Sequence, residues 1–181
     1  MVTRLLLTAA LLIGVLGAPA RAAGTENLQL FRDVQKQVLG YSWFSIFDNV
    51  EAQVNDGVVV LHGKVTMPYK RSDLEQRVAR VDGVRQVVNK IDVLPVSQFD
   101  DRLRRQLARA IYGNPAFRPF ASMVNPPIHI IVDRGRVTLE GVVNNNVDRQ
   151  IANSIASQVL AFEVKNELRT TAEATAELEK L

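Results

Sequence analysis

"VNDGVVVLHGKV", residues 54–65, decides the fold, because a second version of it, "VDRGRVTLEGVV", occupies residues 132–143. The two stretches lie 78 residues apart and are identical at six of their twelve positions. In both, apolar residues alternate with polar ones, which is the two-residue period of a half-buried strand. A short polar turn ending in glycine interrupts each alternation and is a hairpin signal. The chain therefore predicts two copies of a β-hairpin.

Four glycines recur at matching places in the two hairpins. Gly57 and Gly135 end the turns, where a glycine adopts a positive φ at little cost. Gly63 and Gly141 lie within the second strands, where the missing side chain lets another stretch of backbone come close. We predict that all four are structural turn or close-approach residues rather than parts of a chemical site.

The residues on either side of the hairpins predict the same elements in the same order in both halves. Apolar residues three and four apart predict a helix before each hairpin. Thr66 and Asn144 are expected to cap a second helix, and a last strand completes each half. The predicted class is α+β, with two αββαβ domains at residues 27–95 and 98–170. In each, two helices cover one face of a three-stranded mixed sheet. The stripes of the first helices are Leu28, Phe31, Val34 and Val38, and Phe99, Leu103, Leu107 and Ile111.

The first 22 residues are expected to form a secretory signal peptide. Arg4 precedes an apolar run that is short for a membrane span, and Ala20-Arg21-Ala22 offers small residues at the cleavage-determining positions. Cleavage after about Ala22 would place the protein in the periplasm, and an uncleaved membrane anchor is the alternative. The chain contains no cysteine, which excludes a disulfide and a cysteine-linked lipid.

The charge balance argues against nucleic acid as a partner. The formal net charge is +3 for the whole chain and falls to +1 without residues 1–22, which hold two arginines and no acidic residue. A chain so close to neutrality has no strong overall attraction for a polyanion. Charge is instead local, with arginines gathered in residues 99–120 and a lean toward glutamate in residues 163–181.

The repeated unit resembles the BON domain. The pattern V-x-x-G-x-V-x-L-x-G-x-V occurs twice, and each copy continues through a helix to a strand ending in N-x-[IL]. The resemblance covers about residues 28–170 and is to periplasmic proteins such as the osmotically inducible protein Y. It implies a non-enzymatic domain pair that associates with phospholipid surfaces and serves envelope maintenance, for instance under osmotic stress. The longer, proline-rich connection at residues 113–127 departs from the first copy.

No group of residues in the sequence has the pattern of a catalytic or metal site. His62 and His129 are the only histidines, lack ligand spacing to a partner, and are expected to point to solvent. Asp100 and Asp101 stand where a helix begins, and negative charge there favours the helix dipole. We expect no enzyme activity, no metal and no cofactor.

The candidate binding surface is the first helix of the second half together with the residues that follow it. Basic side chains near an anionic lipid surface contribute about 1 kcal/mol each, and aromatic rings tend to settle at the headgroup level. The alternative is that the arginines form the solvated side of a core helix and the aromatics belong to the core. The candidate lipid-binding residues are Arg102, Arg105, Arg109, Tyr112, Phe117, Arg118 and Phe120.

Two other segments leave alternatives open. Trp43, Phe44 and Phe47 either cover the core of the first copy or form a contact with protein or lipid. The acidic tail, residues 171–181, is expected to be a frayed helix or a disordered end, with the option that it folds back on the arginine-rich helix. As an alternative function, the two domains would be a scaffold for envelope proteins without direct lipid contact. The oligomeric state is left open.

Overall fold

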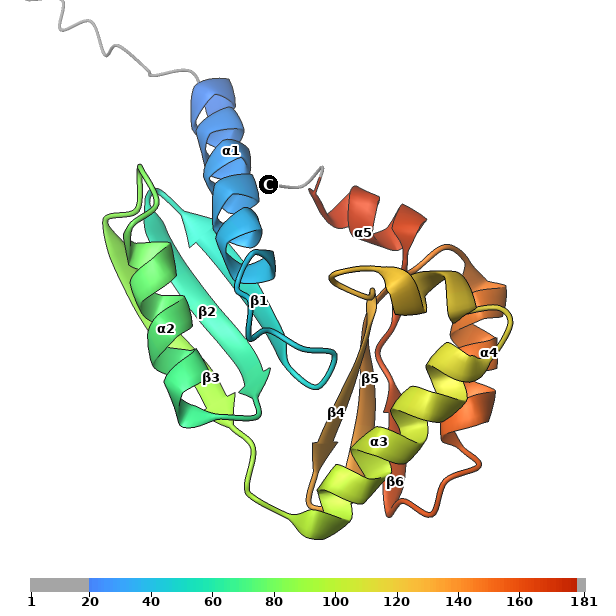
Figure 1. Ribbon diagram of the computed structural model, residues 1–181. Coiled ribbons are helices and arrows are strands. Elements are labelled where there is room, and N and C mark those ends of the chain that lie inside the picture. Colours follow the sequence, from blue (N-terminus) through green and yellow to red (C-terminus); the bar gives the residue numbers. More distant parts are fainter. Residues whose placement is uncertain (1–19, 179–181) are drawn as a thin grey trace, which may run out of the picture.

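The computed structural model describes residues 20–178, and these form two αββαβ units in tandem (Figure 1). The predicted α+β class is confirmed, with mixed sheets whose helices lie on one face. Most of the expected signal peptide lies outside the described residues.

The first unit is built around a three-stranded sheet in which β2 is the middle strand. β1 and β2 form the predicted antiparallel hairpin around the turn Asp56-Gly57, and both turn residues have positive φ. β3 runs parallel to β2, because the intervening helix carries the chain back to the start of the sheet. The elements are α1 (Ala20–Leu39), β1 (Asn49–Asn55), β2 (Val58–Val65), α2 (Pro68–Ala79) and β3 (Gln86–Val93).

The second unit repeats this order with a third strand in two pieces. β6 and β7 both pair in parallel with β5, and together they take the place of β3. The register is the same in both sheets, since Leu61 lies opposite Asn89 and Leu139 lies opposite Asn166. The elements are α3 (Gln98–Gly113), the 3-10 helix η1 (Arg118–Ser122), β4 (Ile128–Asp133), β5 (Arg136–Val143), α4 (Asn146–Ala156), β6 (Glu163–Asn166), β7 (Arg169–Thr170) and α5 (Thr171–Leu178).

Each unit has a separate core between its sheet and its two helices. Burying one leucine, valine or isoleucine side chain contributes roughly 1.5–3 kcal/mol, so these side chains hold helices and sheet together. Leu30 occupies the first core position of α1, where the sequence pattern suggested Leu28. The main core residues are Leu30, Val34, Val38, Val59, Leu61, Leu74, Val78 and Ile91 in the first unit, and Leu103, Leu107, Ile111, Ile130, Leu139, Ala152 and Leu168 in the second.

A repeated asparagine ties the third strand to the second helix in each unit. The Asn89 side-chain nitrogen donates to the Arg71 carbonyl at 3.0 Å, and Asn166 donates to the Arg149 carbonyl at 2.8 Å. The same side chains accept the backbone N–H two residues on, that of Ile91 or Leu168. The asparagine is therefore repeated because its side chain joins the backbone of the second helix to that of the third strand.

The two predicted helix caps are wrong by one residue. Met67 is the N-cap of α2 and makes no capping hydrogen bond, while Thr66 binds the carboxylate of Asp48 instead. In the second unit, Asn145 rather than Asn144 caps α4, and its side chain accepts the N–H of Asp148 at 3.0 Å. Pro68 occupies the first turn of α2, where it lacks only an N–H that the helix does not use.

The acidic tail forms a helix through Leu178 and does not lie on the arginines of α3. Glu173 pairs with Arg149 of α4 at 3.1 Å, and Glu177 pairs with Arg169 at 2.6 Å. The Glu173 carboxylate also accepts the N–H of Thr170 at the start of α5, and that hydrogen bond lowers its pKa. The described part of the tail is thus a helix held against the second unit by ion pairs, and the fold-back hypothesis is wrong for it.

Candidate functional site

The N-terminal end of α3 is fixed by hydrogen bonds to the hairpin of its own unit. Ser97 caps the helix by accepting the N–H of Asp100 at 3.2 Å. The Asp100 carboxylate is buried and accepts the N–H groups of Gly135 at 2.8 Å and Arg134 at 3.0 Å. Its place at a helix start was predicted, but its role in holding the positive-φ turn was not. The same contact exists in the first unit, where Asn27 accepts the N–H of Asp56 at 3.1 Å.

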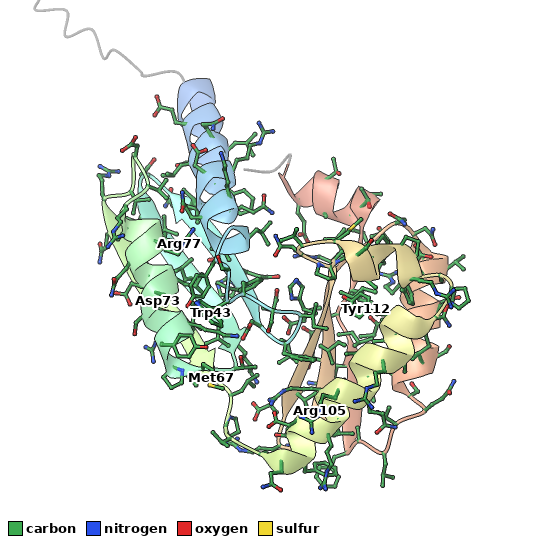
Figure 2. All side chains as sticks on the ribbon, in the orientation of Figure 1. Trp43, Met67, Asp73, Arg77, Arg105 and Tyr112 are labelled. Carbon is green, nitrogen blue, oxygen red and sulfur yellow. The ribbon has the colours of Figure 1, made fainter. Side chains whose placement is uncertain are left out.

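Three of the predicted arginines form the solvent side of α3. Arg102, Arg105 and Arg109 are exposed opposite the buried residues Leu103 and Leu107 (Figure 2 labels Arg105). No ion pair within residues 20–178 involves any of the three. Their positive charge is therefore uncompensated by a direct contact in the described part of the chain.

The other arginines of this segment differ in their surroundings. Arg118 is exposed at the start of η1, away from the helix face. Arg104 is buried and pairs with Asp101 at 2.6 Å, and it donates to the carbonyl of Val132 at 2.5 Å. Arg104 is thus a structural residue that seals one end of β4.

The predicted aromatic residues belong mainly to the core, so their assignment to the binding surface is wrong in this respect. Phe117 is fully buried, and Phe120 is partly buried and stacks on it at 6.3 Å between ring centroids. The Tyr112 hydroxyl donates to the carbonyl of Ile128, and burial raises its pKa above the usual range. The proline-rich segment turns these rings inward, and they cover the end of the second core.

A different apolar group is exposed beside α3 and was missed in the sequence. Phe162 and Leu160 lie in the loop between α4 and β6, with 78% and 87% of their surface exposed. The Phe162 ring lies 6.1 Å from the ring of Phe99, which the helical pattern had placed in the core. Phe99 flanks the first turn of α3 because Asp100 takes the inward position there. The signal for this exposed group in the sequence was the presence of two large apolar residues in a short loop. Phe99, Leu160 and Phe162 are called the apolar patch below.

Side chains that point away from the two cores meet between the units. Lys64 of β2 pairs with Asp133 of β4 at 2.7 Å, and Asn49 of β1 donates to Glu140 of β5. Burial raises the pKa of Glu140, and the neighbouring Glu167 and Glu51 add to the rise while Asn49 opposes it. The hydrogen bond from Lys64 lowers the pKa of Asp133. These contacts between the two sheets are therefore polar.

The connection between α1 and β1 also packs against the second unit. The carbonyl of Ile46 accepts the N–H of Ile130 at 2.7 Å, and Phe47 packs against the second core. Phe44 lies 5.6 Å from the ring of His129, while Trp43 is exposed (Figure 2). The aromatic segment is thus partly core cover and partly a contact between the units.

Neither histidine is a free surface residue. His129 does face away from its own core, but Phe44 and the connection cover it, so the predicted solvent position is wrong. Burial lowers the pKa of His129, and the nearby backbone of Asp48 and its carboxylate oppose this only in part. His62 is about one-third exposed and lies 3.3 Å from Glu51. Strand alternation gave the correct face, but it could not show that a second unit packs there.

A buried ion pair holds the connection in place. Asp48 is fully buried and accepts hydrogen bonds from the ammonium of Lys70 at 2.6 Å and the hydroxyl and N–H of Ser45. Thr66 donates to the other carboxylate oxygen through its N–H and its hydroxyl. Burial alone would raise the pKa of Asp48, but these hydrogen bonds hold it below its ordinary value. Nothing in the spacing of the sequence indicated this network.

An open cleft of about 610 Å³ lies between the units. One wall is formed by Phe31 and Leu39 of α1 and by residues 49–53 of β1. The other wall is formed by residues 125–127, by Arg169 and by α5. Arg169 crosses between the walls, pairing with Glu51 at 3.1 Å and with Glu177 at 2.6 Å. The cleft has the size of a ligand site.

Within residues 20–178, no cluster of three or more acidic or histidine side chains has the arrangement of a metal site. None of the helices described is long and apolar enough to cross a membrane.

A family model described as "BON domain" matches the chain twice, over residues 29–95 and 99–172. Each range covers one αββαβ unit, and the first begins within α1. Among solved structures, CdsD, a structural protein of the type III secretion system of Chlamydia trachomatis, is similar at 16% identity, covering 83% of this chain and 97% of that chain, with a TM-score of 0.29. The C-terminal domain of CdsD is 14% identical, covering 77% of this chain and 96% of that chain, with a TM-score of 0.28. No curated protein matches the chain.

Proposed function

The protein belongs to the BON domain family, and on that premise we propose that it is an exported periplasmic protein that attaches reversibly to anionic phospholipid surfaces. BON domains are generally associated with membrane and phospholipid interaction, and proteins that contain them are generally non-catalytic. The attachment serves maintenance of the cell envelope under stress, including osmotic stress.

One observation carries this proposal: the exposed arginines of α3 have no acidic partner in the described chain and lie on the helix that also carries part of the apolar patch. Arg102 is one helical turn from Phe99, whose ring neighbours Phe162. Arginine side chains would meet the phosphate groups, and the patch would enter the headgroup layer to a shallow depth. The apolar patch replaces Tyr112, Phe117 and Phe120 as the inserting group, because those rings are engaged in the core.

The expected strength is modest. Each arginine near an anionic surface contributes about 1 kcal/mol, so three contribute about 3 kcal/mol, which is a factor on the order of a hundred in partitioning. The Debye length falls from about 8 Å at physiological ionic strength to about 3 Å in 1 M salt, so salt should weaken attachment strongly.

The test is co-sedimentation of residues 23–181 with phosphatidylcholine vesicles and with vesicles containing phosphatidylglycerol, in low and high salt. We expect binding only to the anionic vesicles, loss of that binding in high salt, and its loss when Arg102, Arg105 and Arg109 are together changed to glutamate. A second variant, Leu160→Ser with Phe162→Ser, should weaken binding without changing its dependence on salt.

A matched control makes an equal change of net charge in the first unit. Arg32, Arg71 and Arg80 are exposed in the first unit and take part in no ion pair within the described residues, so their change to glutamate alters net charge equally. If both triple variants lose binding to the same extent, attachment depends on net charge and not on α3. If the unaltered protein does not sediment with either vesicle, the scaffold for envelope proteins becomes the better function.

A further inference from the structure

The two units differ in the hydrogen bonding of the outer edge of their first strand. In a two-residue hairpin, the residues flanking the loop exchange hydrogen bonds, so every second residue before them directs its N–H and C=O away from the partner strand. On β4, whose loop is Arg134-Gly135, the outward residues are Ile128, Ile130 and Val132.

The edge of β4 is partly covered by hydrogen bonds from within the chain. Arg104 donates to the carbonyl of Val132, and Tyr112 donates to the carbonyl of Ile128. Between them, the N–H of Ile130 donates to the carbonyl of Ile46 at 2.7 Å. Two side chains and a turn of the connection between α1 and β1 thus satisfy three of the six outward main-chain groups of this edge.

The corresponding edge of β1 is open. Its outward residues are Val50, Ala52 and Val54, each 78 residues before its counterpart on β4. Among residues 20–178, no loop, turn or side-chain hydrogen bond reaches the main chain of these three. An unpaired edge of this kind is a template for another extended chain.

The reason for the difference lies in the first helix of each unit. Asn27 and Asp100 hold equivalent turns, and Val34 and Leu107 hold equivalent core positions, so α1 and α3 align at a spacing of 73 residues. At that spacing, Phe31 stands in the place of Arg104, and Leu39 stands in the place of Tyr112. Phenylalanine and leucine side chains carry no hydrogen-bond donor, so the carbonyls of β1 stay unpaired.

The open edge faces the cleft between the units. Five consecutive β1 residues, 49–53, line the cleft, as do Phe31 and Leu39, and Figure 1 shows β1 at the border of its sheet nearest to the second unit. At a rise of about 3.3 Å per residue, these five residues present about 13 Å of strand. The cleft also adjoins the interface where Ile46 pairs with β4, because His129, the neighbour of Ile130, lines it.

We propose that this cleft binds an extended polypeptide segment, which adds as a strand to the free edge of β1. The unpaired groups on β1 are alternating main-chain donors and acceptors, and another extended main chain supplies the complementary set. A lipid acyl chain would contact Phe31 and Leu39 but would leave the edge unpaired. This site is separate from the arginine face of α3, so it stands independently of the membrane proposal.

The walls of the cleft also define the side chains of the segment. Successive residues of a strand point to opposite sides. Those directed toward Phe31 and Leu39 should be apolar. Those directed toward Glu51 and Glu177 should be basic, because these two carboxylates share Arg169, and the only other basic side chain beside them in the cleft lining is the partly exposed His62, 3.3 Å from Glu51. The segment therefore alternates apolar and basic residues.

The test uses residues 23–181 and a fluorescein-labelled seven-residue peptide that alternates valine and lysine. We expect saturable binding by fluorescence anisotropy and slower amide hydrogen exchange at Val50 and Ala52 when the peptide is present. Ala52→Pro removes one outward N–H and leaves the pairing with β2 intact, and it should weaken binding at least tenfold. Ala174→Trp fills the cleft from α5 and should have the same effect with β1 unchanged.

Two controls keep the outcome decisive. Ala110→Trp, on the exposed side of α3, should bind the peptide as the unaltered protein does. Two further versions of the peptide are N-methylated, one on its odd-numbered residues and the other on its even-numbered residues. Only the version that presents free N–H groups to β1 should still bind. Equal binding by both methylated peptides, no effect of Ala174→Trp, or no protection of Val50 and Ala52 would overturn the proposal. A dimer formed through β1 without peptide, seen by sedimentation, would assign the edge to a second copy instead.

Discussion

Replacing Lys70 by methionine is expected to destabilise the first unit severely, because it leaves Asp48 buried without its cation. The Asp48 side chain is fully buried and that of Lys70 is 7% exposed, so water cannot replace the ion pair. Methionine has a similar length and removes only the charge and the hydrogen bonds. The four remaining hydrogen bonds, from Ser45 and Thr66, do not supply a positive charge.

Breaking a buried ion pair by removing one partner costs about 3–5 kcal/mol. For a urea m-value of about 2 kcal/mol/M, a loss of about 4 kcal/mol moves the unfolding midpoint by about 2 M. Lys64→Met is the matched control, since the Lys64–Asp133 pair is partly exposed, with 38% and 26% of the two side chains in contact with solvent. Removing an exposed pair of that kind costs about 0.2–1 kcal/mol.

The assay is urea unfolding followed by the fluorescence of Trp43, the only tryptophan, which lies in the connection that Asp48 holds. The pH dependence of the stability provides an independent test. In the unaltered protein the pKa of Asp48 is lowered, so its contribution to stability is present above about pH 3.8 and is lost as the pH falls through the lowered value. In Lys70→Met, the buried carboxyl prefers its neutral form, so stability should rise as the pH falls.

A loss from Lys70→Met no larger than that from Lys64→Met would refute the reasoning. The double variant Asp48→Asn with Lys70→Met adds a further condition. It removes both charges, so it should be more stable than Lys70→Met alone. If the double variant is the less stable of the two, the damage from Lys70→Met comes from packing and not from the uncompensated carboxylate.

Three other substitutions test separate parts of the structure. Asp100→Ala strips two backbone N–H groups of their acceptor in a buried place and should cost about 2–4 kcal/mol in thermal or urea unfolding, whereas Asn27→Ala, which removes one exposed hydrogen bond, should cost less than about 1 kcal/mol. Gly141→Ala sets a Cβ against the carbonyl of Pro127 at a positive φ and should cost at least about 2 kcal/mol, measured in the same way. His129 has a lowered pKa in the folded protein, so stability should fall as the pH drops below about 6.5, and His129→Gln should remove that dependence in urea unfolding followed across the pH range.

The order of helices and strands was well predicted because the residues that recur in the two copies are those that the backbone of the fold requires. Positive φ at Gly57 and Gly135, close approach at Gly63 and Gly141, and the alternation of the strands are local requirements that a hairpin imposes on any sequence. Comparing two copies in one chain separated those requirements from chance. The helix caps were less well predicted, since Thr66 serves Asp48, a residue 18 positions away.

The functional surfaces were harder to predict because they depend on how distant elements meet. Phe117 is aromatic and follows an arginine-rich helix, but the proline-rich segment turns it into the core. Phe162 packs against Phe99 and the hairpin turn at Gly135, and this position leaves most of its ring in contact with solvent. His129 lies on the correct face of its strand, yet the first unit covers that face. Periodicity gives the face of an element and does not tell what packs against it.

Differences between the two copies are therefore more informative about function than their similarities. Asn27 and Asp100 perform one task in both units, as do Asn89 and Asn166, so these positions report the fold. Arg104 has no polar counterpart in α1, so the edge of β4 is hydrogen-bonded within the chain at three of its main-chain groups, whereas the edge of β1 is open to the cleft. Such a difference persists without loss of stability only if water or a ligand satisfies the open edge, because buried unpaired main-chain groups are costly. A duplicated domain in this chain can thus divide its tasks, with α3 facing outward and the β1 edge facing the cleft.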